Sequence, residues 1–154
     1  MISQTINRAD PEKVFITVRN TSGATFSAGA AVYWEVDAVS DGNAVSKAGT
    51  AETNLFAGIV SDMNASDKIV DDAYGLVQTY GVASASVMLG TSAVSYNAGQ
   101  QMVGVAGQNY LQAFSATSSA QMSAFNFVTL FEHIASAAAN SNTAANKSVF
   151  IRAM

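Results

Sequence analysis

The sequence predicts a small all-β fold, either a β-barrel or a β-sandwich, with little helix. Short runs rich in Val, Ile, Phe, Tyr and Thr recur along the chain, and turn residues separate them about every 8–12 positions. Gly occurs eleven times and Pro once, which suits tight turns and bulges. The chain has 154 residues and no Cys, so it is long enough to bury a core without disulfides or metals.

The chain is predicted to begin with an extended arm over residues 1–11, followed by a single β domain over residues 12–154. The arm has no clear periodicity and ends at Asp10-Pro11. A residue that precedes Pro is driven towards extended conformations. Within the arm we expect an anchoring segment made by Ile2, Ile6, Arg8 and Asp10.

The strands follow in order from alternating or continuous apolar runs. They cover residues 14–19, 31–36, 44–47, 55–60, 76–80, 85–89, 101–105, 110–114, 127–134 and 148–152. Gly81 marks a bend or bulge, so the runs on either side of it are one long strand or two. The runs 101–105 and 110–114 form a hairpin. Residues 61–72 and 135–146 are predicted to be loops, each with room for one helical turn.

The hydrophobic core is predicted from the apolar positions of these strands. They are Val14, Ile16, Val18, Val32, Trp34, Phe56, Ile59 and Leu76. Tyr33 and Trp34 are neighbours in one strand and therefore point to opposite faces, so they cannot form one sugar-stacking platform.

Charge is scarce and unevenly placed. Only 12% of residues are charged, against about 25% in a typical domain. None lies between Ala73 and Phe131. Because interface cores lack charge, we favour a surface that is held in an assembly. The alternative is a surface solvated by Ser, Thr, Asn and Gln.

The charge balance also excludes partners. Seven Lys and Arg against eleven Asp and Glu give a net charge of -4, which leaves too few cations for a nucleic-acid face. No run approaches the ~20 apolar residues of a membrane helix, and the first residues do not form a signal peptide. We therefore expect a soluble protein, made in a cytoplasm, with no nucleic-acid or membrane partner.

No catalytic or cofactor site is predicted. His133 is the single histidine, and a lone His in an alternating strand is more often a surface or core residue than a general base. Four acids, Asp62, Asp67, Asp71 and Asp72, do not have calcium-loop spacing and are read as a solvated loop. Glu35 and Asp37 share a strand face and are read as solvent-facing acids rather than a glycosidase pair. Phosphate-binding and nucleophile-elbow motifs are not found.

Five phrases resemble the capsid decoration (cement) proteins of tailed bacteriophages. They are Glu12–Gly23, Phe26–Val32, Leu55–Val60, Tyr74–Gly81 and Ala98–Gln100, within a likeness that spans residues 12–114. The residues after Phe114 depart from the pattern.

The resemblance implies a β-barrel-like or β-tulip protein on the outside of an icosahedral virion. Such proteins bind the major capsid protein, often cluster near three-fold positions, and stiffen the shell against the pressure of the packaged DNA. The implied partners are the major capsid protein and neighbouring copies, with a homotrimer as one arrangement. The arm could add a strand to a neighbouring sheet edge.

Two further functions stay open at this point. One is another phage structural subunit, such as a head fibre, spike or tail protein. The other is a glycan-binding β-sandwich. An enzyme is disfavoured because the residue constellations of catalysis are missing from the sequence.

Overall fold

The computed structural model describes residues 12–35, 42–49, 55–88, 96–114, 128–134 and 144–153. In these ranges the protein is all-β, as predicted, with a single turn of 3-10 helix, η1 (Ala65–Asp67). The strands are β1 (Val14–Asn20), β2 (Phe26–Ser27), β3 (Ala31–Trp34), β4 (Ala44–Ser46), β5 (Phe56–Val60), β6 (Lys68–Ile69), β7 (Tyr74–Met88), β8 (Gln101–Gly104), β9 (Leu111–Ala113), β10 (Val128–Leu130) and β11 (Ala144–Arg152). The arm residues Ile2, Ile6, Arg8 and Asp10 lie outside the described ranges.

The first half of the fold is a closed five-stranded barrel. Its strands pair in the order β1, β4, β3, β5 and β7, and β7 returns to β1. All pairs are antiparallel except β1 with β4, which meet in parallel at Arg19 and Asn20 only. We call it the first barrel.

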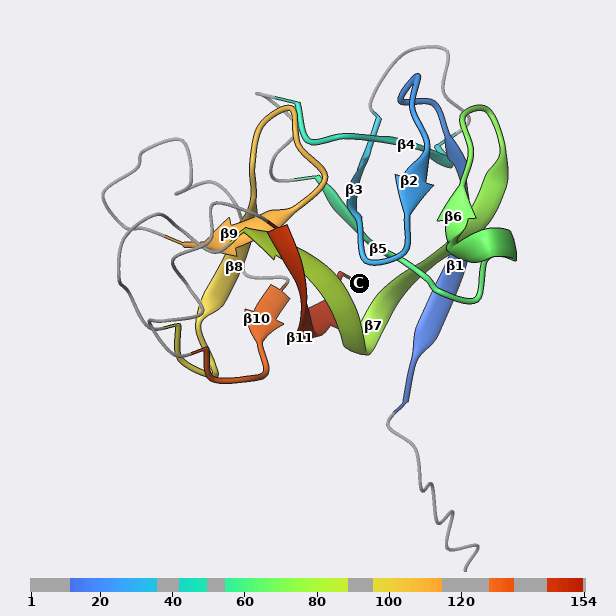
Figure 1. Ribbon diagram of the computed structural model, residues 1–154. Helices are drawn as coiled ribbons and strands as arrows, with labels where there is room; N and C mark the ends of the chain where they lie inside the picture. Colours follow the sequence, from blue (N-terminus) through green and yellow to red (C-terminus); the bar gives the residue numbers. More distant parts are fainter. Residues whose placement is uncertain are drawn as a thin grey trace, which may run out of the picture.

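A second ring of five strands continues from the same long strand. β7 pairs with β11, then β10, β8 and β9 follow, and β9 returns to β7 through one parallel pair, Val87 with Leu111. The predicted hairpin is present here as β8 and β9. We call this ring the second barrel, and Figure 1 shows β7 as a bent ribbon that runs from one barrel into the other.

β7 changes barrels at Gly81, the position where the sequence predicted a bend. Residues before it pair with β1, and residues from Tyr80 onward pair with β11. Gly81 has a φ of +97°, which L side chains rarely adopt. A Cβ atom here would lie 2.2 Å from the carbonyl oxygen of Glu12. Gly81 therefore allows both the turn of β7 and the close passage of the chain that enters β1.

The core divides into two clusters, one for each barrel. The first-barrel core contains Val18, Phe26, Ala30, Val32, Val45, Ala57, Val60, Ile69 and Val77. The second-barrel core contains Ala31, Tyr33, Ala48, Phe56, Ile59, Ala83, Ala85, Val87, Tyr96, Met102, Leu111, Val128, Leu130, Ile134, Val149 and Ile151. β3 and β5 supply alternate residues to both clusters, so the sheet they form is a wall between the barrels.

The predicted core residues are not all equally buried. Val18, Val32, Phe56 and Ile59 are buried, whereas Val14, Ile16, Trp34 and Leu76 are half-buried. Ile16 and Trp34 still pack against the first-barrel core. Leu76 belongs to neither cluster, because its neighbour Val77 takes the inward position and successive side chains of a strand point to opposite faces.

Three segments differ from the sequence-based prediction. The acidic loop contains β6, whose Ile69 pairs with Phe26 and enters the first-barrel core. β11 begins at Ala144 rather than Ser148, because nine residue pairs tie it to β7. His133 lies beyond the end of β10 and is exposed.

Candidate functional site

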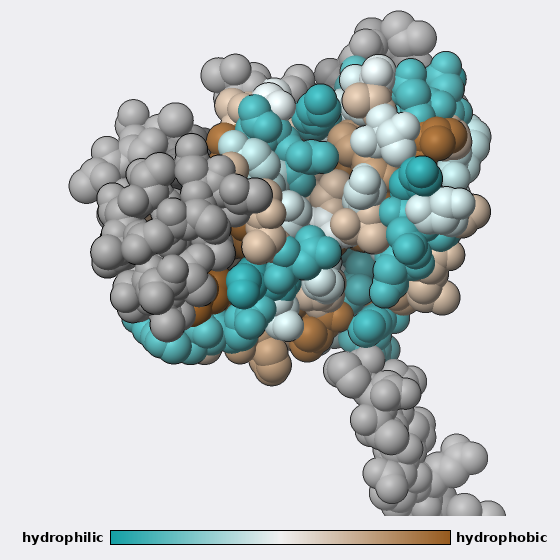
Figure 2. Space-filling view, viewed as in Figure 1, coloured by the Kyte–Doolittle hydropathy of each residue, from teal (hydrophilic) through white to brown (hydrophobic). Residues whose placement is uncertain are grey.

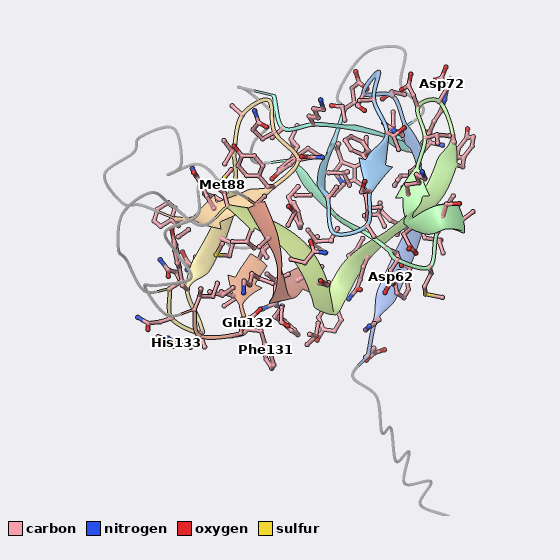
Figure 3. The ribbon with its side chains drawn as sticks, viewed as in Figure 1. Asp62, Asp72, Met88, Phe131, Glu132 and His133 are labelled. Atoms are coloured by element: carbon pink, nitrogen blue, oxygen red, sulfur yellow. The ribbon has the colours of Figure 1, made fainter. Side chains whose placement is uncertain are left out.

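The residues that could carry acid–base chemistry are dispersed. Figure 3 shows His133 and Glu132 beyond β10 in the second barrel, far from Asp62 and Asp72 on the first. A Glu132 carboxylate oxygen accepts the backbone N–H of Ser148 at 2.6 Å. Among the described residues no group of three or more His, Cys, Asp or Glu side chains is placed to hold a metal ion. This arrangement provides neither a general-base pair nor a metal centre.

The carboxylates of the acidic loop have separate structural partners. Asp71 accepts the backbone N–H of Gly23 at 2.9 Å, and Asp72 forms an exposed ion pair with Arg19 at 3.0 Å. The two contacts hold this loop against the end of β1 and against the turn that follows it. Asp71 and Asp72 are exposed, as expected for a solvated loop, but the sequence did not predict that they hold the loop in place.

Glu35 is the described half of the predicted carboxylate pair. It accepts a hydrogen bond from the hydroxyl of Thr21, which ties the end of β3 to the end of β1. Asp37 lies outside the described ranges. The carboxylate of Glu35 therefore has a structural role, as the hydrogen-bond acceptor for Thr21.

Tyr33 and Trp34 point to opposite faces, as the sequence predicts. Tyr33 is in the second-barrel core, edge-on to Phe56 at 5.7 Å between ring centroids, whereas Trp34 packs against the first-barrel core. The Tyr33 hydroxyl has no hydrogen-bond partner within the described structure, and burial raises its pKa far above the usual value. It lies against Gly104, where a side chain would overlap it. This tyrosine is a packing residue.

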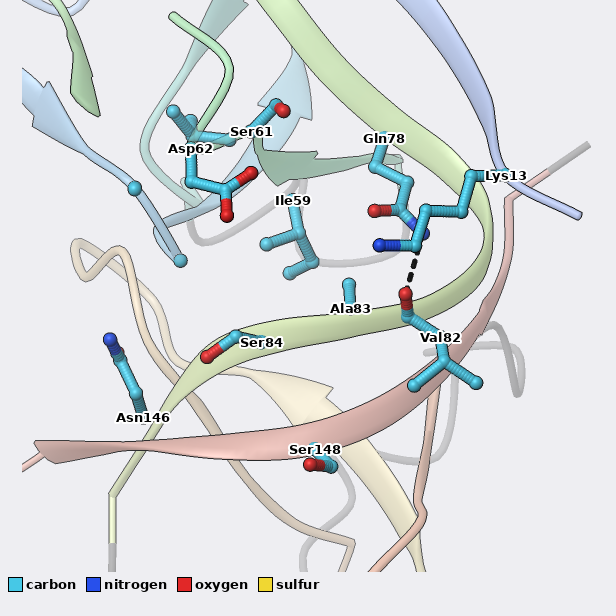
Figure 4. Close-up of a pocket in the computed structure, with 13 residues that line it drawn as sticks. Lys13, Ile59, Ser61, Asp62, Gln78, Val82, Ala83, Ser84, Asn146 and Ser148 are labelled. Atoms are coloured by element: carbon cyan, nitrogen blue, oxygen red, sulfur yellow. Dashed lines mark hydrogen bonds between the residues drawn. The ribbon is translucent and has the colours of Figure 1, made fainter. Parts of the chain in front are cut away.

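A polar cleft opens where the two barrels meet (Figure 4). Its volume is about 340 Å³. It is lined by Lys13, Ala28, Gly29, Ile59, Val60, Ser61, Asp62, Gln78, Val82, Ala83, Ser84, Asn146 and Ser148. These residues come from both barrels and from the bend in β7, so the cleft exists only because the barrels share that strand.

The floor of the cleft exposes the backbone of β7. The side-chain amide of Gln78 donates to the carbonyl oxygens of Tyr80 and Val82 at 2.9 and 3.0 Å. On the same edge, the N–H of Ser86 donates to the carbonyl of Gly29 at 2.7 Å. Figure 4 shows Asp62 and Lys13 reaching towards the cleft from different elements, with Ile59 between them. The cleft therefore offers hydrogen-bonding groups, one positive charge and one negative charge.

Sequence reasoning did not find this cleft. Its residues lie in five distant segments, and nothing in the local pattern joins Lys13 to Asp62 or Asn146. The bend predicted at Gly81 lies beside the cleft. A predicted bend, however, does not indicate which other segments of the chain pack around it.

The surface outside the cleft is mixed. Figure 2 shows hydrophilic and near-neutral residues over most of this face, with hydrophobic residues in small separate spots. The large exposed apolar side chains among the described residues are Met63, Val70, Tyr74 and Phe131.

The charge-free stretch from Ala73 to Phe131 owes part of its composition to the interior. Its described strands supply many residues of the second-barrel core, such as Ala85, Leu111 and Leu130. Between them, residues such as Ser84 face outward. The missing charge therefore reflects both a buried core and a neutral polar surface.

Comparison with known proteins gives a likeness among solved structures. No protein-family model matches the chain, and no curated protein matches it significantly. Among solved structures, the N base of the head fibre protein gp8.5 of bacteriophage phi29 is similar, with a TM-score of 0.47 and 12% sequence identity. The alignment covers 91% of this chain and 94% of that one. No helix in the described ranges is long and apolar enough to cross a membrane.

Proposed function

We propose that this chain is a structural protein of a bacteriophage virion that decorates the outer surface of an icosahedral capsid and stabilises it through contacts with the major capsid protein. The observation that carries the proposal is where the decoration-protein phrases fall in the structure. Five of their six glycines, at 23, 29, 58, 81 and 99, have positive φ, between +73° and +151°, and the exception is Gly75. The phrases therefore coincide with the turns and bends that set the barrel geometry.

The chemistry of the described surface supports an interfacial role rather than a catalytic one. Asp71, Asp72 and Glu132 are engaged in contacts that brace loops, and His133 lies far from Asp62 and Asp72. Beside the cleft, β7 and β11 expose the neutral side chains of Ser84 and Asn146. A surface of this kind can lie against a protein shell without a desolvation penalty for charged groups. Many weak contacts of this kind gain strength when a shell presents many copies.

The proposed anchor is the arm, residues 1–11. It precedes β1, a strand of the first barrel that pairs with β7 from Val14 to Arg19. An extended segment that leaves a firmly paired strand can add to a sheet edge on a neighbouring subunit. Ile2 and Ile6 would supply apolar contacts, and Arg8 and Asp10 ionic ones.

Deletion of residues 1–10 tests this function. Shells assembled from the major capsid protein of the same phage are incubated with the full chain or the truncated chain, and occupancy is measured by sedimentation and electron microscopy. We expect full decoration by the full chain and none by the truncated chain, while thermal unfolding of the two proteins stays the same. A control variant, Lys47→Ala, removes an exposed cation that is not part of residues 1–11 and should decorate normally.

Three results would count against the proposal. Full occupancy of the shells by the truncated chain would show that the arm is not the anchor. Failure of the full chain to bind shells, together with fibres or tubes of the purified protein in negative stain, would instead favour a head-fibre, spike or tail subunit. Quenching of Trp34 fluorescence by sugars would favour a glycan-binding protein.

A further inference from the structure

The cleft between the barrels is lined by two opposite charges. Lys13 precedes β1 and Asp62 follows β5, and both side chains are exposed. No ion pair or side-chain hydrogen bond within the described ranges engages either of them. Figure 4 shows the two side chains on opposite sides of the cleft, with Ile59 between them. The two charges therefore suit a ligand whose own opposite charges are held apart.

The carbonyl oxygen of the Gln78 side chain, Oε1, is a third polar group in the cleft. Gln78 is 5% exposed, and its amide nitrogen donates to the carbonyl oxygens of Tyr80 and Val82. Both partners are acceptors, so the amide nitrogen must face them and Oε1 must face the other way. No donor in the described ranges reaches Oε1, and Figure 4 shows it turned towards Ile59. A buried acceptor held in this way is a preformed partner for one N–H or O–H group.

The backbone of β7 beside the cleft already has partners. The carbonyl oxygen of Gly29 accepts the N–H of Ser86 at 2.7 Å, and a Cβ on Gly29 would lie 3.4 Å from the carbonyl oxygen of Ser84. The carbonyl of Val82 accepts the Gln78 amide. Recognition in the cleft therefore depends on side chains rather than on the addition of a strand.

The rest of the lining gives the cleft an apolar floor and a limited size. Ile59 and Ala83 are 1% and 9% exposed, and Ser84 and Asn146 supply neutral hydrogen-bonding groups beside them. The volume of about 340 Å³ corresponds to about eleven water molecules at about 30 Å³ each. A ligand that fills this space has roughly 9–13 non-hydrogen atoms, the size of two or three linked glycine residues.

We propose that the cleft binds a short peptide of two or three small residues with both ends free. Its ammonium group pairs with Asp62, its carboxylate pairs with Lys13, and one of its amide N–H groups donates to Oε1 of Gln78. A single α-amino acid carries both charges on one carbon atom, and a neutral sugar carries none, so both match the cleft less well. This site goes beyond the proposed decoration function and does not depend on residues 1–11.

Titration calorimetry of the full-length chain with triglycine at low salt tests the inference. We expect a Kd of about 1 mM, which is the ordinary ligand efficiency for about 13 non-hydrogen atoms. Asp62→Asn and Lys13→Gln each remove one charge, and each should weaken binding about fivefold, the upper end for an exposed ion pair.

Matched controls separate this effect from a general effect of net charge. Asp67→Asn and Lys68→Gln remove exposed charges that do not line the cleft, and both should bind triglycine like the wild type. Circular dichroism and thermal unfolding check that each variant is folded.

Peptides with blocked ends assign each charge to its partner. N-acetyl-triglycine lacks the ammonium group and triglycine amide lacks the carboxylate, so each should bind the wild type about fivefold more weakly than triglycine does. Acetylation should have no further effect on Asp62→Asn, and amidation none on Lys13→Gln, because the partner charge is already missing.

Three outcomes would overturn the inference. One is no binding of triglycine far above the expected Kd, and another is wild-type affinity in both Asp62→Asn and Lys13→Gln. The third is galactose that binds more tightly than triglycine and loses affinity in Asp62→Asn, which would assign the cleft to a saccharide. Shell binding is measured separately with the truncated chain, so failure of either proposal leaves the other unaffected.

Discussion

Replacing Gly81 with Ala should destabilise the protein by about 3 kcal/mol. A non-glycine residue held at positive φ costs about 1–3 kcal/mol, and Gly81 has a φ of +97°. The new Cβ would also lie 2.2 Å from the carbonyl oxygen of Glu12, so the chain entering β1 would have to move. Forcing extra atoms into a packed site adds about 1–3 kcal/mol.

Urea unfolding followed by Trp34 fluorescence and circular dichroism measures this loss. The matched control is Gly107→Ala, in the turn between β8 and β9. Gly107 also has a positive φ, +73°, but nothing lies within 4 Å of its Cβ position. It should lose only the conformational part, about 1–2 kcal/mol. Equal losses for the two variants would show that Glu12 does not pack on Gly81 as described, and the shared bend would need another explanation.

Two further predictions concern the cores. Tyr33→Phe should keep or raise stability at neutral pH, by up to about 1 kcal/mol, because it removes a buried hydroxyl without a partner. Burial raises the pKa of the Tyr33 hydroxyl in the folded protein, so above about pH 10 this hydroxyl ionises only in the unfolded chain, and stability falls as the pH rises further. Urea midpoints measured at pH 8 and pH 11 should therefore show a smaller loss of stability at high pH for Tyr33→Phe than for the wild type. A variant less stable than the wild type at pH 8 would contradict this reasoning. Val77→Ala should cost about 2 kcal/mol and Leu76→Ala about 1 kcal/mol, as only Val77 is in a core; equal costs in chemical denaturation would contradict that assignment.

The fold class and many strands could be predicted because their signals are local. Alternation identified β1, and the turn residues after Gly104 identified the β8–β9 hairpin. Gly81 stood out in an otherwise strand-like run. In each case the structure depends on a few residues that are close together in the sequence, and a sequence pattern shows relations of this kind directly.

The sharing of β7 by two barrels could not be predicted in the same way. It depends on pairings between distant segments, such as Val87 with Leu111, that leave no local trace. Where two apolar residues are adjacent, the sequence does not show which of them faces the core. The sequence therefore predicts Leu76 as a core residue, whereas the structure buries Val77. The pairing of Ile69 with Phe26 was missed because β2 and β6 are only two residues long.

The candidate site was the least predictable part. The lack of periodicity before Pro11 predicts the arm, but no local pattern predicts the cleft. A cleft between packed units is set by how their surfaces meet, and Lys13, Asp62 and Asn146 approach one another only after both barrels have closed.

The first and last strands are both fastened to one residue. Val14 pairs with Tyr80 on one edge of β7, and Arg152 pairs with Tyr80 on the other. With about 4.8 Å between neighbouring strands, the two ends of the described chain lie about 10 Å apart. A pull between these ends would therefore load only the hydrogen bonds around Tyr80, in a narrow strip across three strands. The bodies of both barrels would bear almost none of the force, so a copy tethered at both ends would yield at this strip first.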